Sequence, residues 1–263
     1  MACRFARTAK SGLACAVAIL LLSILNGAPA RAQSSSTVPV SRDCQPGNTA
    51  IATESTLPNV AAALQQMKPI KILTIGASSG KRASRGGYAA LIEQMLERAI
   101  GGLDVIMINR GISGELAANA AQRIRTEVAL TEPTLVLWQV GTNDALAYVP
   151  VDQFEATLRD TIRWLKEHNV DLVLVGLQYN TQVAVDDHYR AIRDMLRRVA
   201  AEEKVMVVRR YEAMQFLAEA SKAGPEMFDD IERTGAGYDC LAQYVARAIT
   251  LGAFGKGLQP LPP

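Results

Sequence analysis

The chain has few residues of the types that bind metals or stack on flat ligands. Its 263 residues include two histidines and four cysteines, and aromatic residues make up 5%. The histidines, His168 and His188, fall in different predicted elements. Structural zinc and similar ions need several imidazole or thiolate ligands brought together. The sequence therefore predicts no metal site and no other cofactor, and it offers no obvious aromatic platform for a sugar.

An apolar run long enough to span a membrane is also missing. The longest run, Leu13 to Leu25, has about 13 residues, whereas a spanning helix needs about 20. It follows three basic residues and precedes Ala30-Arg31-Ala32, which is the order of a secretory signal peptide. We expect residues 1–32 to be cleaved after Ala32, leaving a secreted or periplasmic protein without an integral membrane segment. A retained signal anchor is the alternative.

No cluster of basic residues marks the mature chain. The full sequence has 28 basic and 26 acidic residues, and the leader removes four basic residues and no acidic ones, leaving 24 against 26. This near-neutral balance argues against a nucleic-acid partner. A composition of 49% hydrophobic and 21% charged residues is typical of one globular domain with a full core. We expect a monomer.

Two cysteines, Cys44 and Cys240, remain once the leader is removed. In an oxidising compartment a lone pair most simply forms one intramolecular disulfide. Closing so long a loop contributes about 4–5 kcal/mol in the chain-entropy description. Two free buried thiols are the alternative. Residues 33–56 are rich in Ser, Thr, Pro and Asn and have no hydrophobic period, so we expect a flexible, exposed arm there.

Regular hydrophobic patterning begins after this arm. Apolar stripes such as Phe154, Leu158, Ile162 and Leu165 predict amphipathic helices. Between the helices are five short runs rich in β-branched residues, as expected for strands buried on both faces. These runs are Ile70–Ile75, Leu103–Ile108, Thr134–Val140, Asp171–Leu177 and Val205–Val208. The alternation predicts an α/β fold over residues 57–263, a flavodoxin-like three-layer α/β/α sandwich with a five-stranded parallel sheet.

The stretch Ile72 to Gly80, ILTIGASSG, is the first candidate for a functional loop. Its buried run breaks at Gly76 and is followed by Ser78 and Ser79. In a doubly wound sheet, the loops after the carboxyl ends of the strands meet at one edge, where ligands bind. Ser78 is therefore a candidate nucleophile, with Ser79 as the local alternative.

A phosphate-binding loop also begins with a strand and a glycine, but this chain does not complete the pattern. The P-loop requires G-x-x-x-x-G-K-[ST]. Here the segment from Gly76 to Lys81 is one residue short, and Arg82 follows in place of the hydroxyl residue that would hold magnesium. Nucleotide binding is therefore not expected.

Four short motifs occur in the order found in SGNH (GDSL-type) hydrolases, and the chain resembles that superfamily from about Lys68 to Ile249. The matching blocks are Gly76-Ala77-Ser78, Gly111, Gly141-Thr142-Asn143-Asp144 and Asp229-Asp230-Ile231-Glu232. Ala77 replaces an aspartate that is not part of the family's catalytic triad. The resemblance implies the SGNH hydrolase fold and the hydrolysis of esters.

The resemblance also implies roles for individual residues. Ser78 Oγ would attack the ester carbonyl. The developing oxyanion would be held by the backbone N–H groups of Ser78 and Gly111 and by the side-chain amide of Asn143. Removing one such donor typically costs roughly 3–4 kcal/mol of transition-state stabilisation.

The general base is the part of the motif that differs. Glu232 stands where the superfamily has its catalytic histidine, and a serine hydroxyl needs a neighbouring base to become a good nucleophile. Glu232 could serve if burial or repulsion from Asp229 raised its pKa. His188 is the second candidate, because it follows two aspartates that predict a helix N-terminus on the same edge.

Two main functions stay open on the sequence alone. One is an exported hydrolase of O-acyl carbohydrate or lipid esters with acetyl or short acyl groups. The other is a catalytically degenerate SGNH-like domain that binds acylated glycans or lipids, which explains Glu232 most directly. Acyl transfer is a third option. The acidic residues 229–232 could also bind calcium weakly, although such loops are more often solvated.

Overall fold

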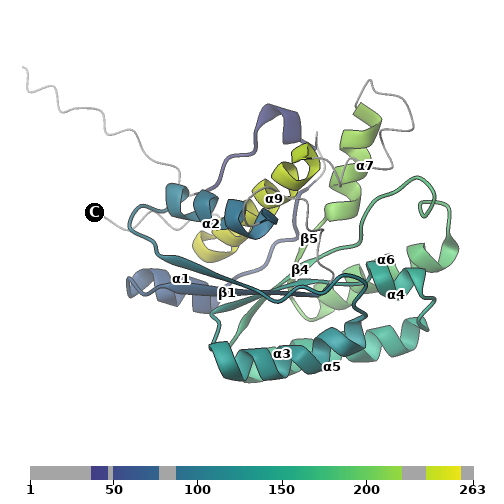
Figure 1. Ribbon diagram of the computed structural model, residues 1–263, viewed down its shortest axis with the longest axis horizontal. Helices are drawn as coiled ribbons and strands as arrows, with labels where there is room; N and C mark the ends of the chain where they lie inside the picture. Colours follow the sequence, from purple (N-terminus) through teal and green to yellow (C-terminus); the bar gives the residue numbers. More distant parts are fainter. Residues whose placement is uncertain (1–36, 47–49, 77–86, 221–234, 256–263) are drawn as a thin grey trace, which may run out of the picture. The chain divides into compact units, whose positions relative to one another are not determined.

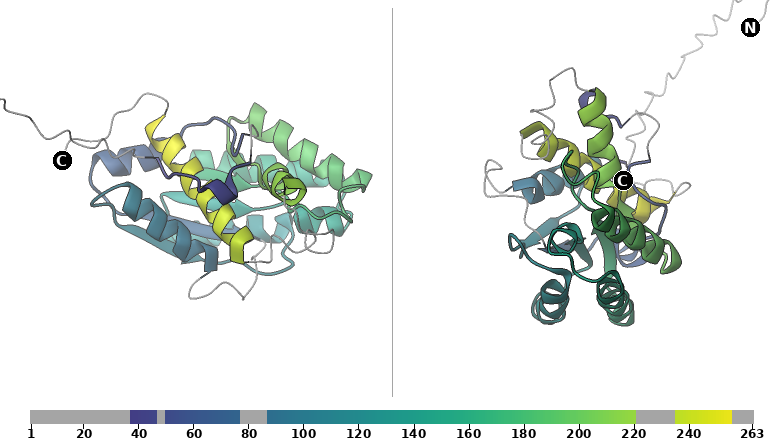
Figure 2. Two further views of the ribbon diagram at one scale, coloured as in Figure 1. Left: turned by 90° about the horizontal axis from the view of Figure 1, so that it is seen from above. Right: turned by 90° about the vertical axis from the view of Figure 1, so that its right-hand side faces the viewer.

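In a computed structural model of the 263-residue chain, the structure describes residues 37–46, 50–76, 87–220 and 235–255 (Figures 1 and 2). By internal contacts the chain divides into residues 1–33 and 34–263, and every described residue belongs to the second unit. Among the described helices, none combines the length and apolar character needed to cross a bilayer.

A five-stranded parallel sheet forms the centre, in the order β2-β1-β3-β4-β5. The predicted α/β class and the five-stranded parallel sheet are therefore confirmed. Strands β3 and β4 are buried along their whole length. This explains why Leu135–Trp138 and Leu172–Val175 are apolar without a break instead of alternating with polar residues. The strands are β1 (Ile70–Gly76), β2 (Val105–Asn109), β3 (Leu135–Gln139), β4 (Asp171–Val175) and β5 (Met206–Val208).

Helices cover both faces of the sheet (Figure 1). Helices α3 and α5 pack together on one face with α6 beside α5, while α2 packs against α9 on the other. The connection from β1 to β2 and the connection from β2 to β3 run in opposite directions across the sheet. Because both crossovers are right-handed, their helices must lie on opposite faces. The described helices are η1 (Arg42–Cys44), α1 (Pro58–Gln65), α2 (Gly87–Ala99), α3 (Ala117–Thr131), α4 (Thr142–Leu146), α5 (Val151–Glu167), α6 (Asp187–Glu202), α7 (Arg210–Ala220) and α9 (Gly235–Phe254).

The described segment before α1 contacts the folded domain, although many of its side chains are exposed. Ala52 forms an antiparallel bridge with Val208 of β5, and the Thr53 N–H donates to the Val207 carbonyl at 2.9 Å. The segment that the sequence suggested as a flexible arm thus covers the outer edge of β5, whose backbone groups would otherwise be unpaired. Val38, earlier in the same segment, is 3% exposed.

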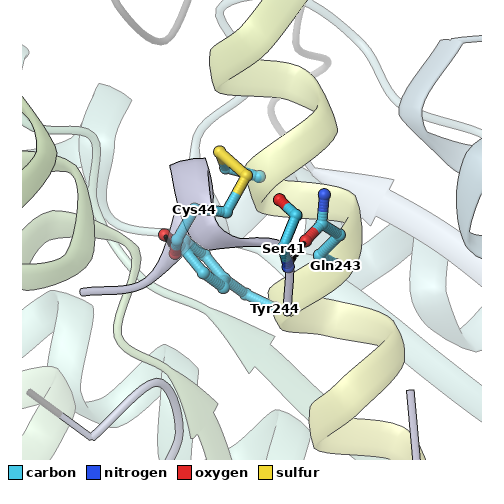
Figure 3. The surroundings of a disulfide bond; sticks show 5 residues. Ser41, Cys44, Gln243 and Tyr244 are labelled. Atoms are coloured by element: carbon cyan, nitrogen blue, oxygen red, sulfur yellow. Dashed lines mark hydrogen bonds between the residues drawn. A yellow bond between two sulfur atoms is a disulfide. The ribbon is translucent and has the colours of Figure 1, made fainter. Parts of the chain in front are cut away.

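A disulfide between Cys44 and Cys240 joins η1 to α9, with the two Cα atoms 5.1 Å apart (Figure 3). Two hydrogen bonds flank it. The Tyr244 hydroxyl donates to the Cys44 carbonyl, and the Ser41 N–H donates to Gln243 Oε1 at 2.7 Å. Figure 2 shows η1 and the residues around it lying beside α9. The covalent link and the hydrogen bonds together hold the N-terminal segment against the last helix.

Candidate active site

The candidate site lies at the point where the direction of the chain across the sheet reverses. Helix α2, which follows β1, and helix α3, which follows β2, lie on opposite faces of the sheet. In open α/β sheets, ligands bind at such a reversal, which here lies between the carboxyl ends of β1 and β3. Gly76, the last residue of β1, pairs with Gln139 at the end of β3. Ser78 comes two residues after Gly76 and lies outside the described residues, as do Asp229 and Glu232.

Gly76 is required by its surroundings. Its φ of +92° is unfavourable for residues with a side chain, and a Cβ atom would lie 2.0 Å from the carbonyl oxygen of Gln139. The backbone can therefore turn out of β1 at this position only because no side chain is present. The glycine at which the apolar run breaks in the sequence is thus required at the end of β1.

Replacing Gly76 with alanine is expected to lower the free energy of unfolding by about 2–4 kcal/mol, because backbone strain adds to a clash with a rigid carbonyl. Urea denaturation of the variant and the wild type measures the loss. The matched control is Gly101→Ala, since a Cβ atom at Gly101 meets no atom within 4 Å. Equal stability of the two variants would contradict this account.

The loop after β2 is tied to the end of β1. The Arg110 N–H donates to the Thr74 carbonyl at 2.8 Å, and the Ile112 N–H donates to the Gly76 carbonyl at 3.0 Å. Gly111 lies between these two bonds. It is therefore held beside the last residues of β1, directly before the stretch that carries Ser78.

The N–H of Gly111, predicted to bind the oxyanion, already has a partner. It donates to Asn109 Oδ1 at 3.1 Å, and that oxygen also accepts from the Thr74 hydroxyl at 3.1 Å. An oxyanion at this amide would have to share or displace the Asn109 oxygen. The role of Gly111 stays a prediction, and its N–H is less available than the sequence alone suggests.

Gly114 offers a second backbone donor that the sequence analysis did not single out. It is exposed, with a φ of +77°, and none of the described residues accepts a hydrogen bond from its N–H. The next residue, Glu115, accepts through its carbonyl from Asn143 Nδ2 at 2.9 Å. The Ser113-Gly114 pair is a turn signal, but the sequence could not show that the residue after Gly114 accepts a hydrogen bond from Asn143.

Asn143 is positioned by the short helix α4. The N-cap of this helix is Gly141, whose φ is +99° and where a Cβ atom would lie 2.7 Å from Leu177 Cδ1. One hydrogen of the Asn143 side-chain amide goes to the Glu115 carbonyl. An amide NH₂ group carries two hydrogens, so the second can donate to another acceptor, such as an oxyanion.

Asp144, the last residue of the same block, connects α4 to α3. Its Oδ1 accepts from the Ala117 N–H at 2.9 Å, across 27 residues of sequence, and so satisfies one of the free N–H groups at the start of α3. Burial raises the pKa of Asp144, and the hydrogen bond from Ala117 partly opposes this rise. The motif thus supplies both a candidate oxyanion donor and a residue that holds the neighbouring loop.

His188, the second candidate base, packs at the start of α6. As the sequence predicts, Asp186 caps this helix, accepting from the Tyr189 N–H at 2.6 Å. Its other oxygen accepts from the Tyr148 hydroxyl at 2.6 Å, and this bond lowers the pKa of Asp186. The rings of Tyr148 and His188 stack with centroids 5.1 Å apart. Within the described part of the chain, the buried Nε2 of His188 has no hydrogen-bond partner.

A metal site is not assembled by the described residues, among which no three His, Cys, Asp or Glu side chains lie close enough to hold an ion. The acidic residues 229–232, considered above as weak calcium ligands, lie outside the described ranges.

Known proteins show the same fold. The chain is 26% identical to Esterase TesA of Pseudomonas aeruginosa over 135 residues, which are 51% of this chain and 65% of the esterase, just under two thirds of its length. A crystal structure of TesA covers 68% of this chain and 97% of its own, at 21% identity and a TM-score of 0.56. Axe2, an acetylxylan esterase from Geobacillus stearothermophilus, covers 68% and 94%, at 23% identity and a TM-score of 0.57.

At these identities the structural matches establish the fold, and the predicted SGNH hydrolase fold is confirmed. The family follows from a sequence profile. The profile of the Non-GDSL lipase-like family matches residues 43–254, a range that contains all four blocks of the motif and the described elements from α1 to α9. The chain therefore belongs to the Non-GDSL lipase-like family, within the SGNH hydrolase superfamily.

Proposed function

We propose that this protein is an exported hydrolase that cleaves acyl esters by a serine mechanism. The observation that carries the proposal is that two segments with candidate oxyanion donors meet near the end of β1. The loop containing Gly111 and Gly114 is hydrogen-bonded to β1, and Asn143 is hydrogen-bonded to the same loop. Ser78 follows β1 directly, so its hydroxyl would meet these donors.

In the proposed mechanism, a base takes the proton of the Ser78 hydroxyl as Oγ attacks the ester carbonyl. The oxyanion of the tetrahedral intermediate accepts hydrogen bonds from the Ser78 N–H and from the second amide hydrogen of Asn143. The third donor is the N–H of Gly114 or of Gly111. Collapse of the intermediate releases the alcohol, which takes up the proton from the base, and water then cleaves the acyl-serine to give the carboxylic acid.

Glu232 is the base that we favour. It stands where the superfamily has its histidine, and repulsion from Asp229 would raise its pKa toward the range in which a carboxylate accepts protons efficiently. His188 fits less well because its ring stacks on Tyr148 and its Nε2 is buried. To act as the base through Nε2, it would have to turn away from Tyr148.

The proposed substrates are O-acyl carbohydrate or lipid esters with acetyl or short acyl groups, and one of the structurally similar proteins is an acetylxylan esterase. Export is supported by the disulfide between Cys44 and Cys240, since such bonds persist in oxidising compartments. We therefore propose that residues 1–32 are a signal peptide cleaved after Ala32. The mature protein would be a monomer in the periplasm or outside the cell.

The alternative function is binding of acylated glycans or lipids without hydrolysis, and Glu232, at the place where the resemblance leads one to expect a histidine, favours it. Incubation of mature residues 33–263 with p-nitrophenyl acetate and with a fluorophosphonate probe separates the two functions. A hydrolase releases p-nitrophenol and becomes covalently labelled. A binding domain does neither and would retain affinity for an acetylated oligosaccharide or a lysophospholipid.

Replacing Asn143 with alanine is expected to lower kcat by roughly 10²–10³-fold, because an oxyanion donor is lost from a pre-arranged site. KM should change little, since the donor acts mainly in the transition state. Steady-state hydrolysis of p-nitrophenyl acetate measures both constants. The control is Asn119→Ala, at an exposed position on α3. A variant at Asn143 with the turnover of the wild type would remove this residue from the mechanism.

A further inference from the structure

A single guanidinium group holds the loop that contains Gly111 and Gly114. Arg123, on α3, donates from Nη1 to Glu115 Oε1 and from Nη2 to the Arg110 carbonyl, each at 2.6 Å. The two acceptors lie at the two ends of the loop. The planar guanidinium of arginine reaches the two acceptors from two nitrogens at a fixed separation, whereas lysine has all its donors on one nitrogen.

We call the contacts of Arg123 with Glu115 and with the Arg110 carbonyl the clamp. The carboxylate of Glu115, at one end of the clamp, depends strongly on Arg123. The Glu115 side chain is 3% exposed, whereas that of Arg123 is 28% exposed. A buried carboxylate is costly unless it is paired. Across the described residues, the second carboxylate oxygen of Glu115 has no hydrogen-bond partner. Among the described residues, Arg123 is therefore the cation that pairs with the buried carboxylate of Glu115.

Glu115 also connects the clamp to the proposed catalytic groups. Its backbone carbonyl accepts the hydrogen bond from Asn143 Nδ2, and its own N–H donates to the Ile112 carbonyl at 3.3 Å, closing the turn around Gly114. A shift of Glu115 would move the Asn143 amide and the peptide unit of Gly114 together. The geometry of both oxyanion donors thus depends on where Glu115 sits.

We propose that Arg123 is a positioning residue that keeps the Arg110–Glu115 loop and Asn143 in the arrangement that binds the oxyanion. This inference rests on the proposed hydrolase function. Arg123 acts through Glu115 and the Arg110 carbonyl rather than on the substrate. Such a residue contributes by holding dipoles in place before charge develops, so its loss should affect the transition state more than substrate binding.

The test compares Arg123→Met and Arg123→Lys in the mature protein with Arg125→Met, which makes the same change at an exposed position two residues along α3. The methionine variant should lose roughly 10- to 100-fold in kcat, with KM within about threefold of wild type. Lysine, which can satisfy one of the two acceptors, should fall between methionine and wild type. Arg125→Met should match the wild type.

A second variant separates positioning from a general loss of stability. In Arg123→Met with Glu115→Gln, the buried charge is removed as well, so stability should recover while kcat stays low. Recovery of kcat along with stability would overturn the positioning role. So would a matching loss in Arg125→Met, or a methionine variant with the kcat of the wild type.

Backbone hydrogen exchange, followed by mass spectrometry, tests the clamp without relying on catalysis. Residues 110–117 should exchange faster in Arg123→Met, with β3 and β4 unchanged. Unchanged exchange in this loop would overturn the inference whatever the activity. An inactive and unlabelled wild type would instead overturn the proposed function, and with it the role of Arg123 in oxyanion binding, even if the exchange result showed that the clamp exists.

Discussion

Replacing Ser78 with alanine is expected to abolish fluorophosphonate labelling and to lower turnover of p-nitrophenyl acetate by on the order of 10³–10⁶-fold. The reason is that no other group in the proposed mechanism can form the acyl intermediate. The oxyanion donors would still bind the substrate carbonyl and leave a small residual rate. Labelling of the mature protein, read by intact mass, measures the first effect, and initial rates measure the second.

Ser79→Ala is the matched control, one residue away with the same change in side chain. It should keep both labelling and turnover. If labelling were lost with Ser79→Ala and kept with Ser78→Ala, the nucleophile would be Ser79. If the wild type is not labelled and hydrolyses no ester, the proposed hydrolase function is wrong. The alternative, binding without hydrolysis, is then retained.

The same assay assigns the base. Glu232→Gln keeps the size of the side chain but cannot accept a proton, and we expect it to lower kcat by roughly 10²–10⁴-fold, the range typical of general base catalysis. His188→Ala should leave kcat near that of the wild type if its packing against Tyr148 is structural. The opposite outcome would assign the role to His188 and require its ring to leave the stacked position seen here.

Replacing both Cys44 and Cys240 with serine is expected to lower the free energy of unfolding by about 4–5 kcal/mol, because the unfolded chain regains the freedom of a very long loop. The two cysteines are separated by 196 residues. Their side chains are also buried, with Cys44 3% and Cys240 4% exposed. Urea denaturation of oxidised wild type and the double variant measures the difference.

Reductant provides the control for the disulfide. Dithiothreitol should destabilise the wild type by a similar amount and leave the double variant unchanged, since only the wild type has a bond to break. A difference below about 1 kcal/mol between oxidised wild type and the double variant would mean that the hydrogen bonds around Tyr244 hold the N-terminal segment without help from the disulfide.

The architecture could be predicted because its causes are local in the sequence. Continuous β-branched runs place strands in the centre of a parallel sheet, since such strands are buried on both faces. Two of the four cysteines lie beyond the predicted signal peptide, and these two leave one possible intramolecular disulfide. Asp186 was predictable as a helix cap for the same reason, because a cap bonds the N–H of a residue only a few positions later.

The position of the proposed oxyanion donors depended on contacts between segments that are distant in the sequence. Whether a glycine N–H is available follows from its neighbours in space, and Asn109 occupies the N–H of Gly111 while that of Gly114 has no described acceptor. The motif could name Asn143, but it could not show that the Glu115 carbonyl orients its amide.

The N-terminal segment also shows a difference between what the sequence predicts and what the tertiary structure decides. Its composition, rich in polar residues and without a hydrophobic period, indicates an exposed arm, whereas the folded chain uses the backbone around Ala52 to complete the edge of β5. The sequence by itself determined the α/β fold, the cysteine pair and the order of the motif blocks, because these follow from periodicity, composition and spacing. The contacts of Arg123, the lack of any acceptor for the Gly114 N–H among the described residues, and the packing of the segment before α1 were decided only by the tertiary structure, because backbone hydrogen bonds and buried charges find partners that no local pattern encodes.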